Sequence, residues 1–182
     1  MDIDKILIKA AETSPTEEEA LLLLKASHNY NQALKIFTVA SEVRDREVGR
    51  VFKLDGEIAP ITPCKIDPFC RYCTFSRQSL TTEEVIEGLH LAEQTGITEI
   101  RLSGGADLSS NGSEIVELVN QVKNLTRLQI NVNAGPSYSR ENLQKLKELG
   151  VGEVGSSLET INPEVFERTK PGDSLKRRME TA

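Results

Sequence analysis

The 182-residue chain lacks the features that would direct it to nucleic acid, to a membrane or out of the cell. Its 22 Lys and Arg residues are outnumbered by 28 Asp and Glu residues, and the net charge of −6 leaves no broad basic surface for nucleic acid or anionic lipid. No apolar run approaches the ~20 residues of a membrane span. The first five residues lack the basic and apolar regions of a secretory signal. We therefore expect a cytoplasmic protein, where free thiols persist.

Cysteine is scarce too, and all three cysteines lie between residues 64 and 73. Cys64, Cys70 and Cys73 have the spacing C-x5-C-x2-C, and three thiols cannot all pair within one chain, which disfavours a disulfide framework. Thiolates are the usual ligands of iron–sulfur clusters, and three of them leave one iron of a four-iron cluster open to another ligand. The alternatives are a zinc site, which would need a fourth ligand although the only histidines, His28 and His90, are distant in sequence, and three unrelated buried thiols.

The first part of the chain has helical patterns. Ser14-Pro15-Thr16-Glu17 predicts a helix start, with an N-cap serine, proline at the first helical position and glutamate at the third. Apolar residues at helical spacing between residues 31 and 47 predict a second helix, which Gly49 ends. We therefore expect residues 1–55 to form an N-terminal helical extension.

From residue 56 the pattern changes to strands that alternate with helices. Strands are predicted at residues 58–62, 98–103, 127–133 and 153–159, and Thr81-Thr82-Glu83-Glu84 is a capping box that begins the first intervening helix. Pro60 is awkward in the first strand, because it cannot donate a hydrogen bond to a neighbouring strand. Strands alternating with helices at this pitch predict an α/β fold with a parallel sheet.

The predicted strands alternate apolar and polar residues. Leu128, Ile130 and Val132 fall on one face of the third strand, whereas Gln129, Asn131 and Asn133 fall on the other. Parallel strands covered on both faces are almost continuously apolar. The alternation therefore favours part of a barrel that holds a polar ligand, and the alternative is a sheet with one solvated face.

The cysteine loop resembles the cluster loop of the radical S-adenosylmethionine (SAM) superfamily, in which an aromatic residue precedes the last cysteine, as Tyr72 does here. The usual spacing there is C-x3-C-x2-C. The longer first interval of this chain resembles a small branch of the biotin-synthase-like enzymes, which helps to build the iron-guanylylpyridinol cofactor of [Fe]-hydrogenase. The resemblance extends over about residues 57–182.

Three further segments resemble SAM-binding motifs of that superfamily. Ser103-Gly104-Gly105 follows the second strand like the glycine motif that contacts the SAM amino group, although Ala106 precedes the acidic Asp107 where the family often has an acidic residue directly. Ser157-Leu158-Glu159-Thr160 resembles a stretch whose carboxylate helps to hold SAM. Arg178 matches an arginine that binds the SAM carboxylate, with Arg177 as the second choice. The resemblance implies that the cofactor-binding residues are Tyr72, Ser103, Gly104, Gly105, Asn133, Ser157, Glu159 and Arg178.

The resemblance implies a radical SAM enzyme. Its [4Fe–4S] cluster is held by Cys64, Cys70 and Cys73, and SAM binds the open iron. An electron donor reduces the cluster, and SAM is cleaved to a 5′-deoxyadenosyl radical that abstracts hydrogen from a small-molecule substrate. The alternatives are another biotin-synthase-like enzyme and a non-catalytic zinc-binding module. A full β/α barrel has eight strands, so residues 56–182 are expected to form its first half, about four βα units. More of the chain or a second polypeptide would supply the rest.

Overall fold

The computed structural model describes residues 2–75 and 77–182. The chain divides into two compact units, Met1–Phe52 and Lys53–Ala182. Among the described residues the first unit contains α1 (Ile3–Ala10), α2 (Glu17–Ala26) and α3 (Tyr30–Val48). The second contains β1 (Asp55–Ile58), α4 (Thr82–Glu93), β2 (Glu99–Ser103), α5 (Ser113–Val122), β3 (Gln129–Asn133), α6 (Arg140–Glu148), β4 (Val154–Gly155), α7 (Pro163–Thr169) and α8 (Leu175–Thr181). No described helix combines the length and apolar character needed to cross a membrane.

The helix starts follow local capping chemistry. The capping box before α4 is confirmed, because the Glu84 amide donates to Thr81 Oγ1 at 3.2 Å and the Thr81 amide donates to the Glu84 carboxylate at 2.8 Å. The predicted start at Ser14 is wrong by two residues. Thr16 is the N-cap of α2, and Glu19 completes its capping box. Ser14 and Thr16 both have a glutamate three positions later, and the helix begins at the second, where the Glu19 amide donates to Thr16 Oγ1 and the Thr16 amide donates to the Glu19 carboxylate.

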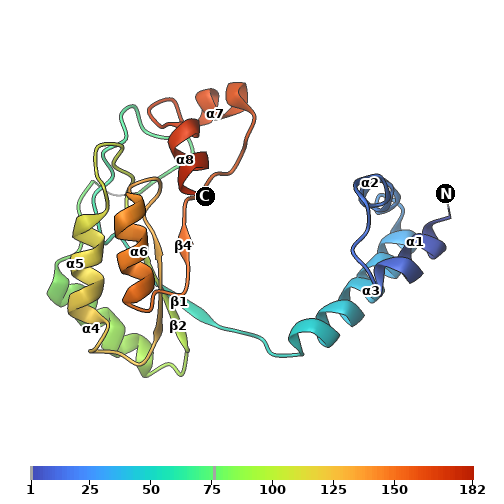
Figure 1. Ribbon diagram of the computed structural model, residues 1–182, viewed down its shortest axis with the longest axis horizontal. Coiled ribbons are helices and arrows are strands. Elements are labelled where there is room, and N and C mark those ends of the chain that lie inside the picture. Colours follow the sequence, from blue (N-terminus) through green and yellow to red (C-terminus); the bar gives the residue numbers. More distant parts are fainter. Residues whose placement is uncertain (1, 76) are drawn as a thin grey trace. The chain divides into compact units, whose positions relative to one another are not determined.

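The four strands form one parallel sheet in the order β1-β2-β3-β4. Each strand therefore pairs with the next one in the sequence. In Figure 1 the helices α4, α5 and α6 lie on one side of this sheet, and α7 and α8 follow the end of β4. The α/β class predicted from the alternating pattern, with helices first and then four strands, is confirmed.

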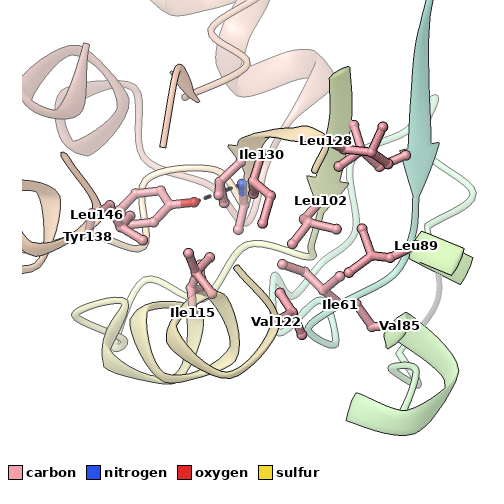
Figure 2. Close-up of a cluster of buried hydrophobic side chains, with 14 residues drawn as sticks. Ile61, Val85, Leu89, Leu102, Ile115, Val122, Leu128, Ile130, Tyr138 and Leu146 are labelled. Atoms are coloured by element: carbon pink, nitrogen blue, oxygen red, sulfur yellow. Dashed lines mark hydrogen bonds between the residues drawn. The ribbon is translucent and has the colours of Figure 1, made fainter. Parts of the chain in front are cut away.

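The main hydrophobic core lies between the sheet and the helices α4, α5 and α6. Ile100, Leu102, Ile130 and Val132 contribute it from the strands. Figure 2 shows the helical side chains that meet them, and the Tyr138 hydroxyl that accepts a hydrogen bond from the Ala134 amide at 3.2 Å. Buried apolar side chains thus account for one face of β2 and β3, and the partly buried Ile58 of β1 and Val154 of β4 pack against them.

The other face of the sheet is polar. Glu57, Arg101 and Asn131 are aligned across β1, β2 and β3, and Ser103 is aligned with Asn133 one step further along. Ser103 Oγ donates to the Glu57 carboxylate at 2.5 Å. The predicted alternation of strand residues is therefore present in the packing.

Two strands are shorter than the sequence predicts. β1 ends at Ile58, before Pro60, and Ile61 then continues beside β2 by donating its amide to the Ser103 carbonyl at 2.9 Å. β4 ends at Gly155, because Ser157 and Glu159 have φ values of 43° and 56°, in the left-handed region that no strand residue occupies. Both corrections fall where the chain enters the loops around the polar site.

Candidate functional site

One pocket of about 190 Å³ lies where β2 and β3 end, since Ser103 and Asn133 are the last residues of those strands. The residues that the sequence singled out all line this pocket, although they come from five separate segments. They are Cys64, Cys70, Tyr72, Cys73, Ser103, Gly104, Gly105, Asn133, Ser157, Glu159 and Arg178.

The first part of the cysteine loop is fixed by main-chain hydrogen bonds to the segment after β2. The Gly105 amide donates to the Thr62 carbonyl at 2.8 Å, and the Lys65 amide donates to the Ala106 carbonyl at 2.9 Å. These bonds flank Cys64 on both sides. These main-chain hydrogen bonds therefore fix the backbone at Cys64, and with it the position of the first thiol.

The two glycines are needed for this close approach. A Cβ on Gly105 would lie 2.2 Å from the Cys64 nitrogen, and a Cβ on Gly104 would lie 2.1 Å from Thr62 Oγ1. Both distances are far below van der Waals contact. The glycine pair, which the sequence connected with SAM, thus has a packing role in seating the cysteine loop as well.

Asp107 reinforces the same junction. Its carboxylate accepts from Lys65 Nζ at 2.8 Å, from the Ser109 amide at 2.8 Å and from the Ser109 hydroxyl at 2.6 Å. These donors, with Lys65 first, lower the pKa of Asp107 to about 2. A lysine adjacent to the first cysteine is thereby tied to the loop after β2.

The second part of the cysteine loop is held by the segment between α7 and α8. The Arg71 amide donates to the Thr169 carbonyl at 2.8 Å. Gly172 lies against Asp67 and Pro68 so closely that a Cβ on it would come within 2.4 Å of the Pro68 carbonyl oxygen. The loop is therefore fastened at both ends by segments more than thirty residues away in sequence.

The three thiols have different surroundings. Cys64 is buried, Cys70 is partly buried, and Cys73 is exposed with its sulfur 3.4 Å from the Phe75 amide. Burial, the largest influence, raises the pKa of the Cys70 thiol. Within the described residues no three His, Cys, Asp or Glu side chains are gathered closely enough to hold a single metal ion.

The donor set of the pocket fits an iron–sulfur cluster. Three thiols on one wall are soft ligands that suit iron and sulfide. A closed zinc site would need a fourth ligand, and the carboxylates lining the pocket, Glu57 and Glu159, already pair with Ser103 and Lys170. Tyr72 lies beside the thiols, and burial, followed by the charge of Glu159, raises the pKa of its phenol.

The wall formed by residues 156–178 carries a buried charge network. Arg178 donates to the Asp173 carboxylate through Nε at 2.7 Å and also pairs with it through Nη2 at 2.6 Å, and the Asp173 side chain is fully buried. Arg178 Nη1 contacts the Ser156 carbonyl and donates to the Ser157 carbonyl at 2.9 Å. The guanidinium that was predicted to bind the SAM carboxylate thus lines the pocket. In this structure it is bound to the Asp173 carboxylate and to two main-chain carbonyl groups. Arg177 instead donates to the Pro136 carbonyl at 3.3 Å.

Two charged residues of this site escaped the sequence prediction. Glu57 reaches the pocket from β1, and Lys170 reaches it from the end of α7, with only 3% of its surface exposed. The polar alternation of the strands could have indicated Glu57. Nothing local to Thr169-Lys170-Pro171-Gly172 distinguishes a buried lysine from a solvated one.

Comparison with known proteins bears on this arrangement. The family model described as "Radical SAM superfamily" matches residues 60–182. The chain belongs to the radical SAM superfamily. Members of that superfamily use a [4Fe–4S] cluster and SAM, and the matched region contains every residue that the sequence singled out for those groups.

Relatives within the radical SAM superfamily are of moderate similarity. The chain is 32% identical over 173 residues to an uncharacterized protein of Methanocaldococcus jannaschii, covering 90% of this chain and 45% of the relative. It is 28% identical over 157 residues to the [FeFe] hydrogenase maturase subunit HydE of Thermotoga maritima, covering 82% and 43%. The crystal structure of methylornithine synthase (PylB) has a TM-score of 0.77 at 24% identity over 98% of this chain and 53% of PylB, which shows a common fold. The chain spans about half the length of the curated relatives it matches.

Proposed function

We propose that this protein is a radical SAM enzyme of the biotin-synthase-like branch, with a [4Fe–4S] cluster held by Cys64, Cys70 and Cys73. When bound and reduced, the cluster supplies the electron that cleaves SAM to methionine and a 5′-deoxyadenosyl radical, which abstracts hydrogen from a small-molecule substrate. The observation that carries the proposal is the single pocket in which the cysteine loop faces the ends of β2 and β3 and the Ser157–Glu159 turn.

The chain's own residues have positioning roles in this proposal. Main-chain bonds on both sides of Cys64 hold the first ligand, and Thr169 holds the later part of the loop. Ser103, Asn133 and Glu159 line the same pocket and carry hydrogen-bonding groups. Such polar groups orient a bound cofactor whose own atoms carry out the difficult chemistry.

We propose that the enzyme catalyses a step in the biosynthesis of the iron-guanylylpyridinol cofactor of [Fe]-hydrogenase. Five residues between Cys64 and Cys70 support this role, because the longer interval resembles that branch of the family. Another biotin-synthase-like activity is the second candidate, and the similarity to the maturase subunit HydE favours it. Both candidates require an external electron donor that reduces the cluster. Both also imply a cytoplasmic location, because free thiols persist there.

Metal and sulfide analysis tests the proposal. We expect protein reconstituted without oxygen to bind about four irons per chain, as a [4Fe–4S] cluster requires. The electron paramagnetic resonance spectrum of the reduced protein should change when SAM is added. A version extended by further βα units should form 5′-deoxyadenosine under dithionite. One zinc per chain with no iron would instead support a zinc-binding module.

The two candidate substrates need a separate comparison. The same extended protein, reduced and loaded with SAM, is incubated with precursors of a pyridinol ring and, in parallel, with the substrates of other biotin-synthase-like enzymes. The proposed role predicts that only the pyridinol precursors stimulate 5′-deoxyadenosine formation and are consumed in proportion to it. Stimulation by another substrate alone would overturn the specific role while leaving the reaction class intact.

A further inference from the structure

Lys170 is a buried lysine that lines the pocket, and its ammonium group has three oxygen partners. It pairs with the Glu159 carboxylate, donates to the Ser157 carbonyl at 2.9 Å and lies 3.8 Å from Asp173 Oδ2. The ammonium also lies 5.5 Å from the centre of the buried Phe166 ring. A buried lysine persists only when it is paired in this way.

The partners of Lys170 belong to a strained segment. Ser157 and Glu159 are the only described residues other than glycine that have positive φ, at 43° and 56°. Left-handed backbone is unfavourable at a residue with a Cβ and persists where the surroundings enforce it. Lys170 contacts both residues, one through its carbonyl and one through its carboxylate.

Lys170 also belongs to the segment that holds the cysteine loop. The carbonyl of the preceding residue, Thr169, accepts from the Arg71 amide at 2.8 Å, and Gly172 packs against Asp67 and Pro68. A short segment therefore contacts the cysteine loop through its backbone and the Ser157–Glu159 turn through one side chain. The segment thus connects the cysteine loop to the Ser157–Glu159 turn.

We propose that Lys170 is a positioning residue for the SAM site. It fixes the left-handed Ser157–Glu159 turn so that the Glu159 carboxylate faces the cysteine loop in one orientation. This inference rests on the proposed function, because it assumes that SAM binds in this pocket. Lys170 itself acts through Glu159 and has no direct part in the reaction.

The test compares three variants of the reconstituted protein: Lys170→Met, Glu159→Gln and the double variant. Calorimetry with SAM should show that Lys170→Met weakens binding about tenfold or more, the factor expected from losing a hydrogen bond to a charged group. Glu159→Gln should have a similar effect. The double variant should be no weaker than the weaker single variant, because the two residues act as one unit. Iron content should stay at the wild-type value in all three.

The matched control is Lys176→Met, the same substitution at a lysine on α8 whose side chain is 85% exposed. It should leave SAM affinity and the SAM-induced spectral change of the reduced cluster unaltered. Lys170→Arg keeps the positive charge and serves if Lys170→Met fails to fold. It should bind SAM more tightly than Glu159→Gln does.

Three outcomes would each overturn the inference alone. The first two are wild-type SAM affinity in folded Lys170→Met and fully additive losses in the double variant. SAM affinity of Lys170→Arg at or below that of Glu159→Gln would also do so. A wild-type protein that holds the cluster and binds no SAM would overturn the proposed function itself, so the two failures are distinguishable.

Discussion

At the scale of single residues, the three cysteines are predicted to act together. Each supplies one thiolate, and loss of any one leaves a cluster with two protein ligands. Cys64→Ala, Cys70→Ala and Cys73→Ala should each abolish stable binding of four irons after reconstitution without oxygen. A stable four-iron cluster in any single variant would contradict the ligand assignment.

Arg178 is predicted to matter for folding as well as for SAM. Removing its guanidinium leaves the fully buried Asp173 without its main partner, and breaking a buried ion pair in this way costs about 3–5 kcal/mol. Arg178→Ala should therefore lower the free energy of unfolding, measured with urea, by that amount. Lys176→Ala, at an exposed ion pair of 3.7 Å, should change it by less than about 0.5 kcal/mol.

Asp173→Asn separates the two roles of Arg178. It keeps the shape of the side chain and removes the charge that competes for the guanidinium. A direct contact between Arg178 and the SAM carboxylate predicts SAM binding as tight as in the wild type or tighter. Weaker binding in folded Asp173→Asn would assign Arg178 to the architecture of the pocket wall instead.

Asp107 makes stability depend on pH in acid. Its pKa is lowered from 3.8 to about 2 in the folded protein, so the charged form stabilises the fold above pH ~4, and this contribution is lost as the pH falls from ~4 through ~2. Because Lys65 is mostly exposed, we expect the contribution to be about 1–2 kcal/mol. Asp107→Asn should therefore be less stable than the wild type at pH 6 by urea unfolding. The difference should shrink towards pH 2, and a constant difference would contradict this origin.

At the scale of helices and strands, the sequence predicted features that depend on neighbouring residues better than features that depend on contacts between distant segments. The capping box at Thr81 and the apolar faces of the strands depend on neighbours in sequence or on a simple period, and both are present in the structure. The early end of β4 and the burial of Lys170 depend on partners in other segments. Period and composition carry no information on such pairings, so the sequence could assemble the pocket only through its resemblance to a family.

Gly105 tests how the cysteine loop is seated on the loop after β2. A methyl group there would collide with the Cys64 backbone, 2.2 Å from its nitrogen, and would push the first ligand out of place. Gly105→Ala should bind substantially less iron than the wild type. Gly88→Ala is the control. A Cβ at this helical site would meet the side chain of Ile58, whose terminal methyl group is nearest at 3.0 Å, and alanine favours a helix over glycine by about 1 kcal/mol. Equal iron content in both variants would contradict the seating role.

At the scale of the whole molecule, the sheet has two ends. Among the described residues β1 pairs only with β2, and β4 pairs only with β3. A closed β/α barrel leaves no such edges and has eight strands in about 250 residues. The half-length coverage of the relatives agrees with a sheet that further strands complete. Uncovered strand edges tend to pair with other chains. An incomplete barrel should therefore self-associate, which can be measured.

We therefore predict that these 182 residues, produced alone and without oxygen, bind iron but self-associate and form little 5′-deoxyadenosine. The polar face that carries Glu57, Arg101 and Asn131 would then be open to water, and a water-filled site both weakens electrostatic positioning and quenches reactive intermediates. Light scattering and product analysis would compare this chain with a version extended by four further βα units from a relative. The extended protein should be monodisperse and faster in SAM cleavage. A monodisperse 182-residue monomer that cleaves SAM equally fast would mean that four strands suffice, and that the edges of β1 and β4 are protected by their short length alone.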